Sequence, residues 1–294
     1  MQIPFSKMHG AGNDYLVVDC SAGDPVRDWA PFARYALDRH LGVGGDQLLL
    51  VQPSSQAAFS MGIRNADGSL AEMCANGLRA FTKYLRDRGL VDRDEFELET
   101  LGGVVGVRWL GPDPDARGRD QDRVEVRLFP PILEPEKVPT LLRPASGSGP
   151  ALEVPLEVDG QTLRVSCVSI GNPHCVIFSE DVAGAPLERL GPRIEHHPAF
   201  PERTNVEFVE ALSQGELVQR TWERGVGETL ACGSGACAAA VAAILTDRAQ
   251  RELVLHLRGG DLAARWPEDG GAIWLTGPAT FVFEAQLEYP GEPR

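Results

Sequence analysis

The sequence predicts an α/β protein made of two similar halves, and three observations support this fold class. A short motif occurs twice, as Cys74-Ala75-Asn76-Gly77-Leu78 and as Cys232-Gly233-Ser234-Gly235-Ala236, about 158 residues apart. Short apolar segments bounded by Gly and Pro recur along most of the chain, which indicates many strands. Each half also has one convincing helix, directly after its cysteine. We therefore expect two strand-rich units with central helices, facing each other across one site.

Several polar residues repeat at nearly the same offset as the two cysteines. The pairs are Gln47 with Asn205, Asn65 with Glu223 and, within one residue, Gly12-Asn13 with Gly171-Asn172. A constant register at four places favours a duplicated half-chain over two unrelated Gly-rich turns. The register puts the start of the second half near Val124.

The individual elements follow from local composition. Strands are expected where apolar and β-branched residues run between turn residues, at 15–18, 48–51, 97–100, 104–109, 124–128, 163–168, 175–178 and 253–257. Helices are expected at 29–40, 77–88, 187–190 and 235–245, the last because it is rich in Ala and lacks Pro. The Pro-, Asp- and Arg-rich stretch 111–123 predicts an exposed loop or connector.

Length and composition exclude several classes of protein. A chain of 294 residues exceeds the usual domain size, so two domains are the default. A net charge of -14 argues against a nucleic-acid partner. The longest small and apolar run, residues 236–245, is too short to cross a bilayer, and the N-terminal residues lack a signal-like apolar stretch. We expect a cytoplasmic protein with no membrane partner.

The six cysteines are expected to be reduced thiols, because no secretory signal accompanies them. They are Cys20, Cys74, Cys167, Cys175, Cys232 and Cys237. The four outside the repeated motif are expected to be buried small hydrophobes. No Cys-x-x-Cys pair exists, so no metal site is expected. The glycine-rich loop 42–47 lacks the Lys-Ser/Thr of a phosphate-binding loop.

The position of the paired cysteines suggests acid/base chemistry. Each stands just before a helix and is followed by a capping-type residue, Asn76 or Ser234. The unpaired N–H groups at a helix N-terminus lower a thiol pKa from about 8.5 toward neutrality and can also hold a carboxylate. The neighbouring glycines let a ligand approach the backbone closely.

Two similar acid/base groups on opposite sides of one carbon invert its configuration. One thiolate removes the α-proton, and the opposing thiol delivers a proton to the other face. A single base would return the proton to the side it left. Charge that spreads onto the substrate carboxylate can be stabilised by fixed N–H donors, each contributing roughly 3 to 4 kcal/mol.

A pyridoxal phosphate enzyme is the competing explanation for chemistry at an amino-acid α-carbon, since that cofactor forms a Schiff base with lysine. The chain has three lysines, Lys7, Lys83 and Lys137, and none is a good candidate. Lys7 is the best placed, but we expect it to be a surface charge at the end of the first strand. We therefore expect no cofactor. His174, which follows Gly171-Asn172-Pro173, is expected to support catalysis.

These residues resemble the diaminopimelate epimerase family, the cofactor-independent two-cysteine enzymes of lysine and peptidoglycan precursor synthesis. The resemblance spans nearly the whole chain. The matching segments are Met8-His9-Gly10-Ala11-Gly12-Asn13-Asp14, Gly42-Val43-Gly44-Gly45-Asp46-Gln47, Asn65-Ala66-Asp67-Gly68-Ser69, Gly171-Asn172-Pro173-His174, Phe200-Pro201-Glu202-Arg203-Thr204-Asn205, Glu223-Arg224-Gly225-Val226-Gly227-Glu228-Thr229 and Ala231-Cys232-Gly233-Ser234-Gly235. The family usually has glycine where this chain has Ala75.

The resemblance implies that Cys74 and Cys232 interconvert LL- and meso-diaminopimelate, with His174 and Glu223 tuning the thiol pKa values. The implied substrate-binding residues are Asn13, Gln47, Asn65, Ala75, Asn76, Asn172, Asn205, Glu223, Arg224, Gly233 and Ser234. It further implies a homodimer and two pseudo-symmetric domains, each a strand-rich β-roll or barrel around a central helix, with the active site in the cleft between them. The implied domains are residues 1–123 with 277–294, and residues 124–276.

Two alternatives stay open at this point. The first is a two-cysteine racemase that acts on another amino acid, such as proline, hydroxyproline or histidine. A different class is a redox-responsive binding protein, in which Cys74 and Cys232 form a reversible disulfide without turnover.

Overall fold

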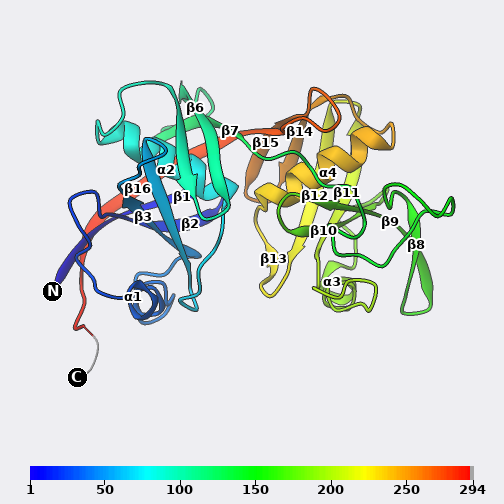
Figure 1. The fold of residues 1–294 in the computed structure, drawn as a ribbon, viewed down its shortest axis with the longest axis horizontal. Coiled ribbons are helices and arrows are strands. Elements are labelled where there is room, and N and C mark those ends of the chain that lie inside the picture. Colours follow the sequence, from blue (N-terminus) through cyan, green and yellow to red (C-terminus); the bar gives the residue numbers. More distant parts are fainter. Residues whose placement is uncertain (292–294) are drawn as a thin grey trace. The chain divides into compact units, whose positions relative to one another are not determined.

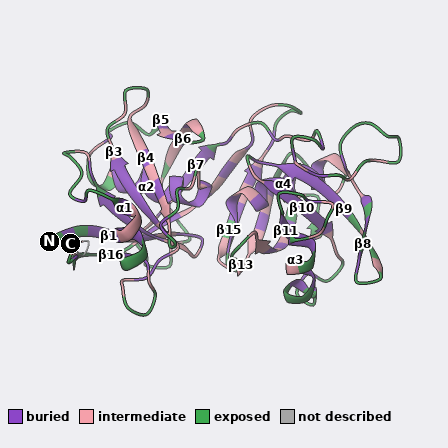
Figure 2. Cartoon of the chain, turned by 60° about the horizontal axis from the view of Figure 1, so that its bottom comes forward, coloured by how far each residue is buried: buried purple, intermediate pink, exposed green. Residues whose placement is uncertain are grey.

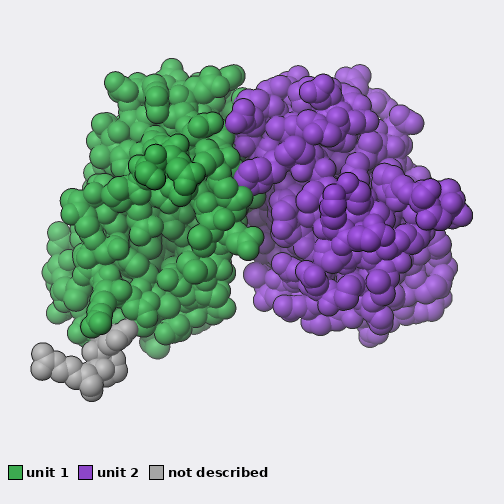
Figure 3. All heavy atoms as spheres, viewed as in Figure 1, with its two compact units in different colours: residues 1–126, 276–294 green, residues 127–275 purple. Residues whose placement is uncertain are grey.

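The computed structural model describes residues 1–291 of the chain. It divides into two compact units, Met1–Val126 with Thr276–Arg294, and Arg127–Leu275 (Figure 3). The boundaries lie within two strands, β7 (Gln121–Arg127) and β16 (Trp274–Glu288). Cys74 belongs to the first unit and Cys232 to the second.

The first unit is a closed sheet with helix α2 (Ala75–Asp87) packed against it (Figure 1). The strands follow the order β1 (Gln2–Gly10), β2 (Asn13–Asp19), β3 (Gln47–Gln52), β4 (Phe59–Asn65), β5 (Glu95–Thr100), β6 (Gly103–Pro112), β7 and β16. Strand β16 also pairs antiparallel with β1, which closes the sheet into a barrel. Helix α2 contacts β1, β2 and β6, and the short helix α1 (Trp29–Ala36) contacts β4.

The second unit is a curved sheet around helix α4 (Gly233–Leu245). Its strands follow the order β15 (Gly260–Arg265), β14 (Glu252–Leu257), β12 (Glu216–Glu223), β11 (Asn205–Ser213), β10 (Pro173–Phe178), β9 (Gln161–Ser169) and β8 (Val154–Val158), with β13 (Gly227–Thr229) on β12. Helix α3 (Leu187–Glu195) contacts β8, β11, β12 and β13. Helix α4 is apolar on all sides and contacts five strands, so it forms the core of the unit (Figure 2).

The two units repeat one local arrangement. In the first, β2 runs parallel to β3 and β3 antiparallel to β4, with Tyr15 opposite Gln47 and Gln47 opposite Asn65. In the second, β10 runs parallel to β11 and β11 antiparallel to β12, with His174 opposite Asn205. Each arrangement leads to a 13-residue helix capped by a cysteine. Residues that repeat at a constant offset in the sequence therefore occupy equivalent positions in the strand pairing of the two units.

The structure corrects several expected boundaries. Helix α1 ends at Ala36 rather than at residue 40, because the chain turns there and Gly42 N–H bonds to Asp38 O. Helix α3 continues to Glu195 with Pro192 inside it, beyond the expected end at residue 190. Helices α2 and α4 each begin two residues earlier than expected, because the cysteines themselves occupy the N-cap positions.

Candidate active site

Cys74 is the N-cap residue of helix α2. Its backbone is extended (φ -145°, ψ 109°), and its Sγ accepts a hydrogen bond from Gly77 N at 3.4 Å. The prediction that Asn76 acts as the helix-capping residue was wrong, because Cys74 is the N-cap. Asn76 lies in the first helical turn, where its Oδ1 accepts from Arg79 Nη2 at 2.7 Å. The thiol therefore occupies the position that a serine or aspartate oxygen takes in other helices.

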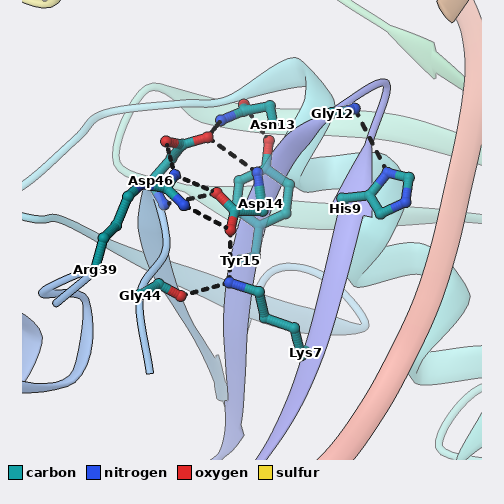
Figure 4. A network of polar contacts seen from close by, with 9 residues as sticks. All are labelled: Lys7, His9, Gly12, Asn13, Asp14, Tyr15, Arg39, Gly44 and Asp46. Atoms are coloured by element: carbon teal, nitrogen blue, oxygen red, sulfur yellow. Dashed lines mark hydrogen bonds and ion pairs between the residues drawn. The ribbon is translucent and has the colours of Figure 1, made fainter. Parts of the chain in front are cut away.

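Asn13 and Tyr15, from the start of β2, lie beside the Cys74 thiol. The Tyr15 hydroxyl is 3.4 Å from Sγ and donates a hydrogen bond to Asn13 Oδ1. The thiol itself lies 3.8 Å from that Oδ1. The Asn13 amide nitrogen donates to Asp46 Oδ2 at 2.6 Å, which fixes the side chain between the strand and the loop before β3 (Figure 4).

A charged network supports this loop. Arg39 contacts both Asp14 and Asp46, at 2.7 and 2.6 Å, and Lys7 Nζ is 2.6 Å from Asp14 (Figure 4). Burial alone raises the pKa of Asp14, but the hydrogen bonds from Arg39 and Lys7 outweigh it and hold the pKa at about 2. Lys7 was expected to be a surface charge at the end of a strand. It instead lies inside β1, is 12% exposed and is paired with Asp14.

Gln47 and Asn65 extend the first half-site across the next two strands. They face each other in the β3–β4 register, and Gln47 Nε2 donates to Asn65 Oδ1 at 2.9 Å. Asn65 Nδ2 in turn donates to Ser69 Oγ at 3.0 Å. Within residues 1–291, the buried Gln47 Oε1 accepts no hydrogen bond. A ligand N–H group is the kind of partner that this oxygen lacks.

Cys232 is the N-cap of helix α4 and is more deeply placed than Cys74. Its backbone is extended (φ -120°, ψ 113°), and its Sγ accepts from Gly235 N at 3.3 Å and lies 3.5 Å from Ser234 Oγ. Burial raises the pKa of this thiol well above its ordinary value, and the carboxylates of Glu223 and Glu207 raise it further. The helix N-terminus was expected to lower the pKa toward neutrality, and for Cys232 this was wrong. Desolvation and two carboxylates outweigh the helix N–H groups.

His174 and Glu207 form a buried pair next to this thiol. Both side chains have no exposed surface, and His174 Nδ1 is 2.8 Å from Glu207 Oε1. The second ring nitrogen, Nε2, is 3.0 Å from Asn172 Oδ1. The ring is therefore held between Glu207 on β11 and the Asn172 side chain, and its two nitrogens are both hydrogen-bonded inside the core. An added Cβ at Gly235 would lie 2.7 Å from Glu207 Oε1, which places the carboxylate on the first turn of α4.

Asn205, Glu223 and Arg224 lie at the adjoining ends of β11 and β12. Asn205 Oδ1 accepts from Arg224 N at 3.0 Å, and its Nδ2 donates to Pro173 O at 2.8 Å. Glu223 accepts a 2.5 Å hydrogen bond from Thr229 Oγ1. The Arg224 side chain donates to Glu202 O at 2.9 Å. The predicted residues of the second half therefore gather around the ends of three strands and the start of α4.

Sequence reasoning missed three residues of these half-sites. Tyr15 stands at the same offset from His174 as Asn13 does from Asn172, so extending the repeat by two residues would have found it. Glu207 lies two residues after Asn205, on the same face of β11. Asp46 directly precedes Gln47 in the glycine-rich loop 42–47. No signal beyond its acidity marked it.

The four remaining cysteines, Cys20, Cys167, Cys175 and Cys237, are buried, as expected. Burial raises the pKa of both Cys20 and Cys167 to about 12. Among residues 1–291, no group of His, Cys, Asp and Glu side chains is arranged to hold a metal ion. In the same part of the chain, every helix is too short or too polar to span a membrane.

Sequence comparison identifies the family. A family model described as diaminopimelate epimerase matches residues 5–118 and 166–282. A diaminopimelate epimerase of Moorella thermoacetica is 47% identical over 283 residues, covering 96% of this chain and 98% of the relative. One from Acetivibrio thermocellus is 43% identical over 284 residues, covering 97% and 98%. The chain belongs to the diaminopimelate epimerase family.

Solved structures of lower sequence identity share the fold of this family member. A PhzF-family protein of Bacillus anthracis superposes with a TM-score of 0.69 at 15% identity, covering 98% of this chain and all of the other. A probable proline racemase from Agrobacterium radiobacter K84 has the same TM-score at 16% identity, with coverage of 97% and 93%. These likenesses confirm the predicted fold class.

Proposed function

We propose that this chain interconverts LL- and meso-2,6-diaminopimelate without a cofactor, with Cys74 and Cys232 as the two acid/base groups. Membership in the diaminopimelate epimerase family makes it an isomerase and gives the substrate class. The observation that supports the pair of thiols is their equivalence. Each caps a buried 13-residue helix, and each lies beside the same strand arrangement.

The reaction moves one proton off the α-carbon and another onto its opposite face. The thiolate of one cysteine takes the α-proton and becomes a thiol, while the S–H of the other cysteine supplies the new proton and becomes a thiolate. The carbanion charge spreads onto the carboxylate between these steps. First-turn N–H groups at Ala75-Asn76 and Gly233-Ser234 stabilise that charge, as helix N-termini do for anions.

The environment of each thiol suggests which cysteine donates a proton and which accepts one at the start of a turnover. Burial and two carboxylates favour the protonated form of Cys232, so it rests as the proton donor. Cys74 is less buried than Cys232, and we assign it the role of the base in the opposite half-site. His174 and Glu223 tune the thiols, and each turnover exchanges the two protonation states.

The polar side chains around the two cysteines recognise the second amino-acid end of the substrate. They are Asn13, Gln47, Asn65, Asn172, Asn205 and Arg224. Amide oxygens such as the unpartnered Gln47 Oε1 suit a substrate ammonium group, and the arginine suits a carboxylate. This set favours a substrate with two amino-acid heads over an amino acid with an apolar side chain.

We place the protein in the cytoplasm as a homodimer. The reduced thiols expected from the sequence suit a reducing compartment, and the homodimer follows from the family resemblance. Light scattering on the purified protein measures its molar mass and so tests the homodimer. Fractionation of cells that produce the protein tests whether it is found in the cytoplasm. A monomer at micromolar concentration, or recovery in a secreted fraction, would contradict these assignments.

Hydrogen exchange tests the activity directly. Purified protein with LL-diaminopimelate in deuterium oxide is expected to give meso product that carries deuterium at one α-carbon. Proline, hydroxyproline and histidine are incubated in parallel and are expected to stay unlabelled. Absence of exchange, in a preparation whose two thiols still react with an alkylating agent, would rule the function out. Exchange with another amino acid alone would reassign the chain as a racemase of that substrate.

A further inference from the structure

Tyr15 is a fully buried residue whose hydroxyl lies against the Cys74 thiol. The oxygen is 3.4 Å from Cys74 Sγ and donates a hydrogen bond to Asn13 Oδ1. The same Oδ1 lies 3.8 Å from the thiol. One amide oxygen is therefore shared by a phenol and a thiol, and Asp46 holds that amide in place from the other side (Figure 4).

Tyr15 also occupies the position in the first unit that His174 occupies in the second. Each stands two residues after an asparagine, on the first strand of the repeated arrangement. Each lies opposite a polar residue of the next, parallel strand, Gln47 for Tyr15 and Asn205 for His174. The duplicated half-sites therefore present a phenol at one cysteine and an imidazole near the other.

The phenol keeps its proton in this environment. Burial, and then the neighbouring Cys74, raise the pKa of Tyr15 well above its ordinary value, so the hydroxyl stays a donor across the neutral range. The charged or titratable groups that face it are Cys74 and Arg79 from α2 and Asp46 from the loop before β3. Its pairing partner on β1 is the uncharged Met8.

We propose that Tyr15 stabilises the deprotonated form of Cys74, donating its hydrogen bond to Asn13 while Cys74 is a thiol and to the sulfur once Cys74 is a thiolate. Rotation about the Cζ–Oη bond is sufficient for this exchange, because both acceptors already lie within reach of the oxygen. The inference rests on the proposed function, since only a cysteine that cycles between two protonation states needs such a switch. No bond other than hydrogen bonds is made or broken at Tyr15.

Alkylation of Cys74 tests this without requiring turnover. The Tyr15→Phe variant keeps the ring and removes only the hydroxyl, so the thiolate loses a donor that favours the charged form. In a Cys232→Ala background, we expect the pH midpoint of Cys74 alkylation by iodoacetamide to rise, with roughly tenfold slower reaction at neutral pH. Tyr84→Phe, at another buried tyrosine of this unit, is the control and is expected to leave the profile unchanged. Coincident profiles for wild-type and Tyr15→Phe proteins would overturn the inference.

A second substitution covers the case in which Tyr15→Phe fails to fold. Replacing Tyr15 by 3-fluorotyrosine keeps the hydroxyl and makes it a stronger donor, so the Cys74 midpoint is expected to fall instead of rise. An unchanged or higher midpoint would contradict the inference. Wild-type activity on diaminopimelate is measured separately, so an inactive wild-type protein would count against the proposed function, whereas unshifted alkylation would count against Tyr15 alone.

Discussion

His174 and Glu207 form a hydrogen-bonded pair in the core of the second unit, with Nδ1 2.8 Å from Oε1 and neither side chain exposed. The pair adjoins the first turn of α4, where Gly235 N–H binds the Cys232 sulfur. Glu207 therefore acts on two groups at once. Its Oε1 binds the His174 ring, and its negative charge opposes a thiolate at Cys232.

Glu207→Gln is expected to make Cys232 more reactive. Glutamine still accepts the hydrogen bond from His174 but lacks the negative charge, and that charge is one cause of the raised thiol pKa. Because the pKa falls, the thiolate fraction at a fixed pH rises. In a Cys74→Ala background, iodoacetamide at pH 8.5 should alkylate Cys232 roughly tenfold faster. Glu210→Gln, on the same strand, is the control, and equal rates for both variants would refute the role of Glu207.

Gly235→Ala and Gly77→Ala are expected to differ although they occupy equivalent helix positions. A Cβ at Gly235 would lie 2.7 Å from the buried Glu207 Oε1, whereas one at Gly77 meets its nearest neighbour, Cys74 Cβ, at 3.3 Å. We expect Gly235→Ala to lower the free energy of unfolding by roughly 1 to 3 kcal/mol. Gly77→Ala should stay within about 1 kcal/mol, since alanine also favours the helix. Urea denaturation compares the two, and equal losses would show that the Glu207 contact imposes no constraint.

Asp14→Asn is expected to destabilise the protein in a pH-dependent way. The pKa of Asp14 is held at about 2 in the folded state, below its ordinary value of 3.8. A depressed carboxyl pKa contributes stability that is fully present above about pH 4 and is lost as the pH falls toward 2. At pH 7 the variant should lose about 2 kcal/mol of unfolding free energy, and the difference from wild type should shrink between pH 4 and pH 3.

Urea titrations at pH 7, 4 and 3 measure this difference. Asp92→Asn, at an exposed position of the same unit, is the matched control and should change stability little at any of these pH values. A loss for Asp14→Asn that stays constant over the whole range would show that the ion pairs with Lys7 and Arg39 are not its cause.

The sequence predicted the repeated parts of the fold because they are apolar and regularly spaced. Strands β3, β9, β10 and β14 carry uninterrupted or alternating apolar residues, and α4 is apolar on every side. The fixed offset between polar residues also corresponds to equivalent strand pairing, since Tyr15 lies opposite Gln47 in one unit and His174 lies opposite Asn205 in the other. Local pattern and duplication together were enough for the fold class.

Long-range pairing and buried charge were not predictable in the same way. Strand β11 was missed because it contains the buried polar residues Asn205 and Glu207, whose partners come from other strands. Lys7 was misplaced because its partner Asp14 is seven residues away, on the neighbouring strand. The high pKa of Cys232 depends on burial and on carboxylates distant in sequence. A helix N-terminus seen alone suggested the opposite shift.

The most direct test of two-thiol catalysis is the α-proton inversion rate of three single variants. Cys74→Ala and Cys232→Ala should each lose inversion of LL-diaminopimelate by at least about a thousandfold, because each removes one of two required proton carriers. Cys237→Ala, on the same helix as Cys232 but buried away from the N-cap, should keep wild-type turnover. Full turnover in both Cys74→Ala and Cys232→Ala would contradict catalysis by the two thiols.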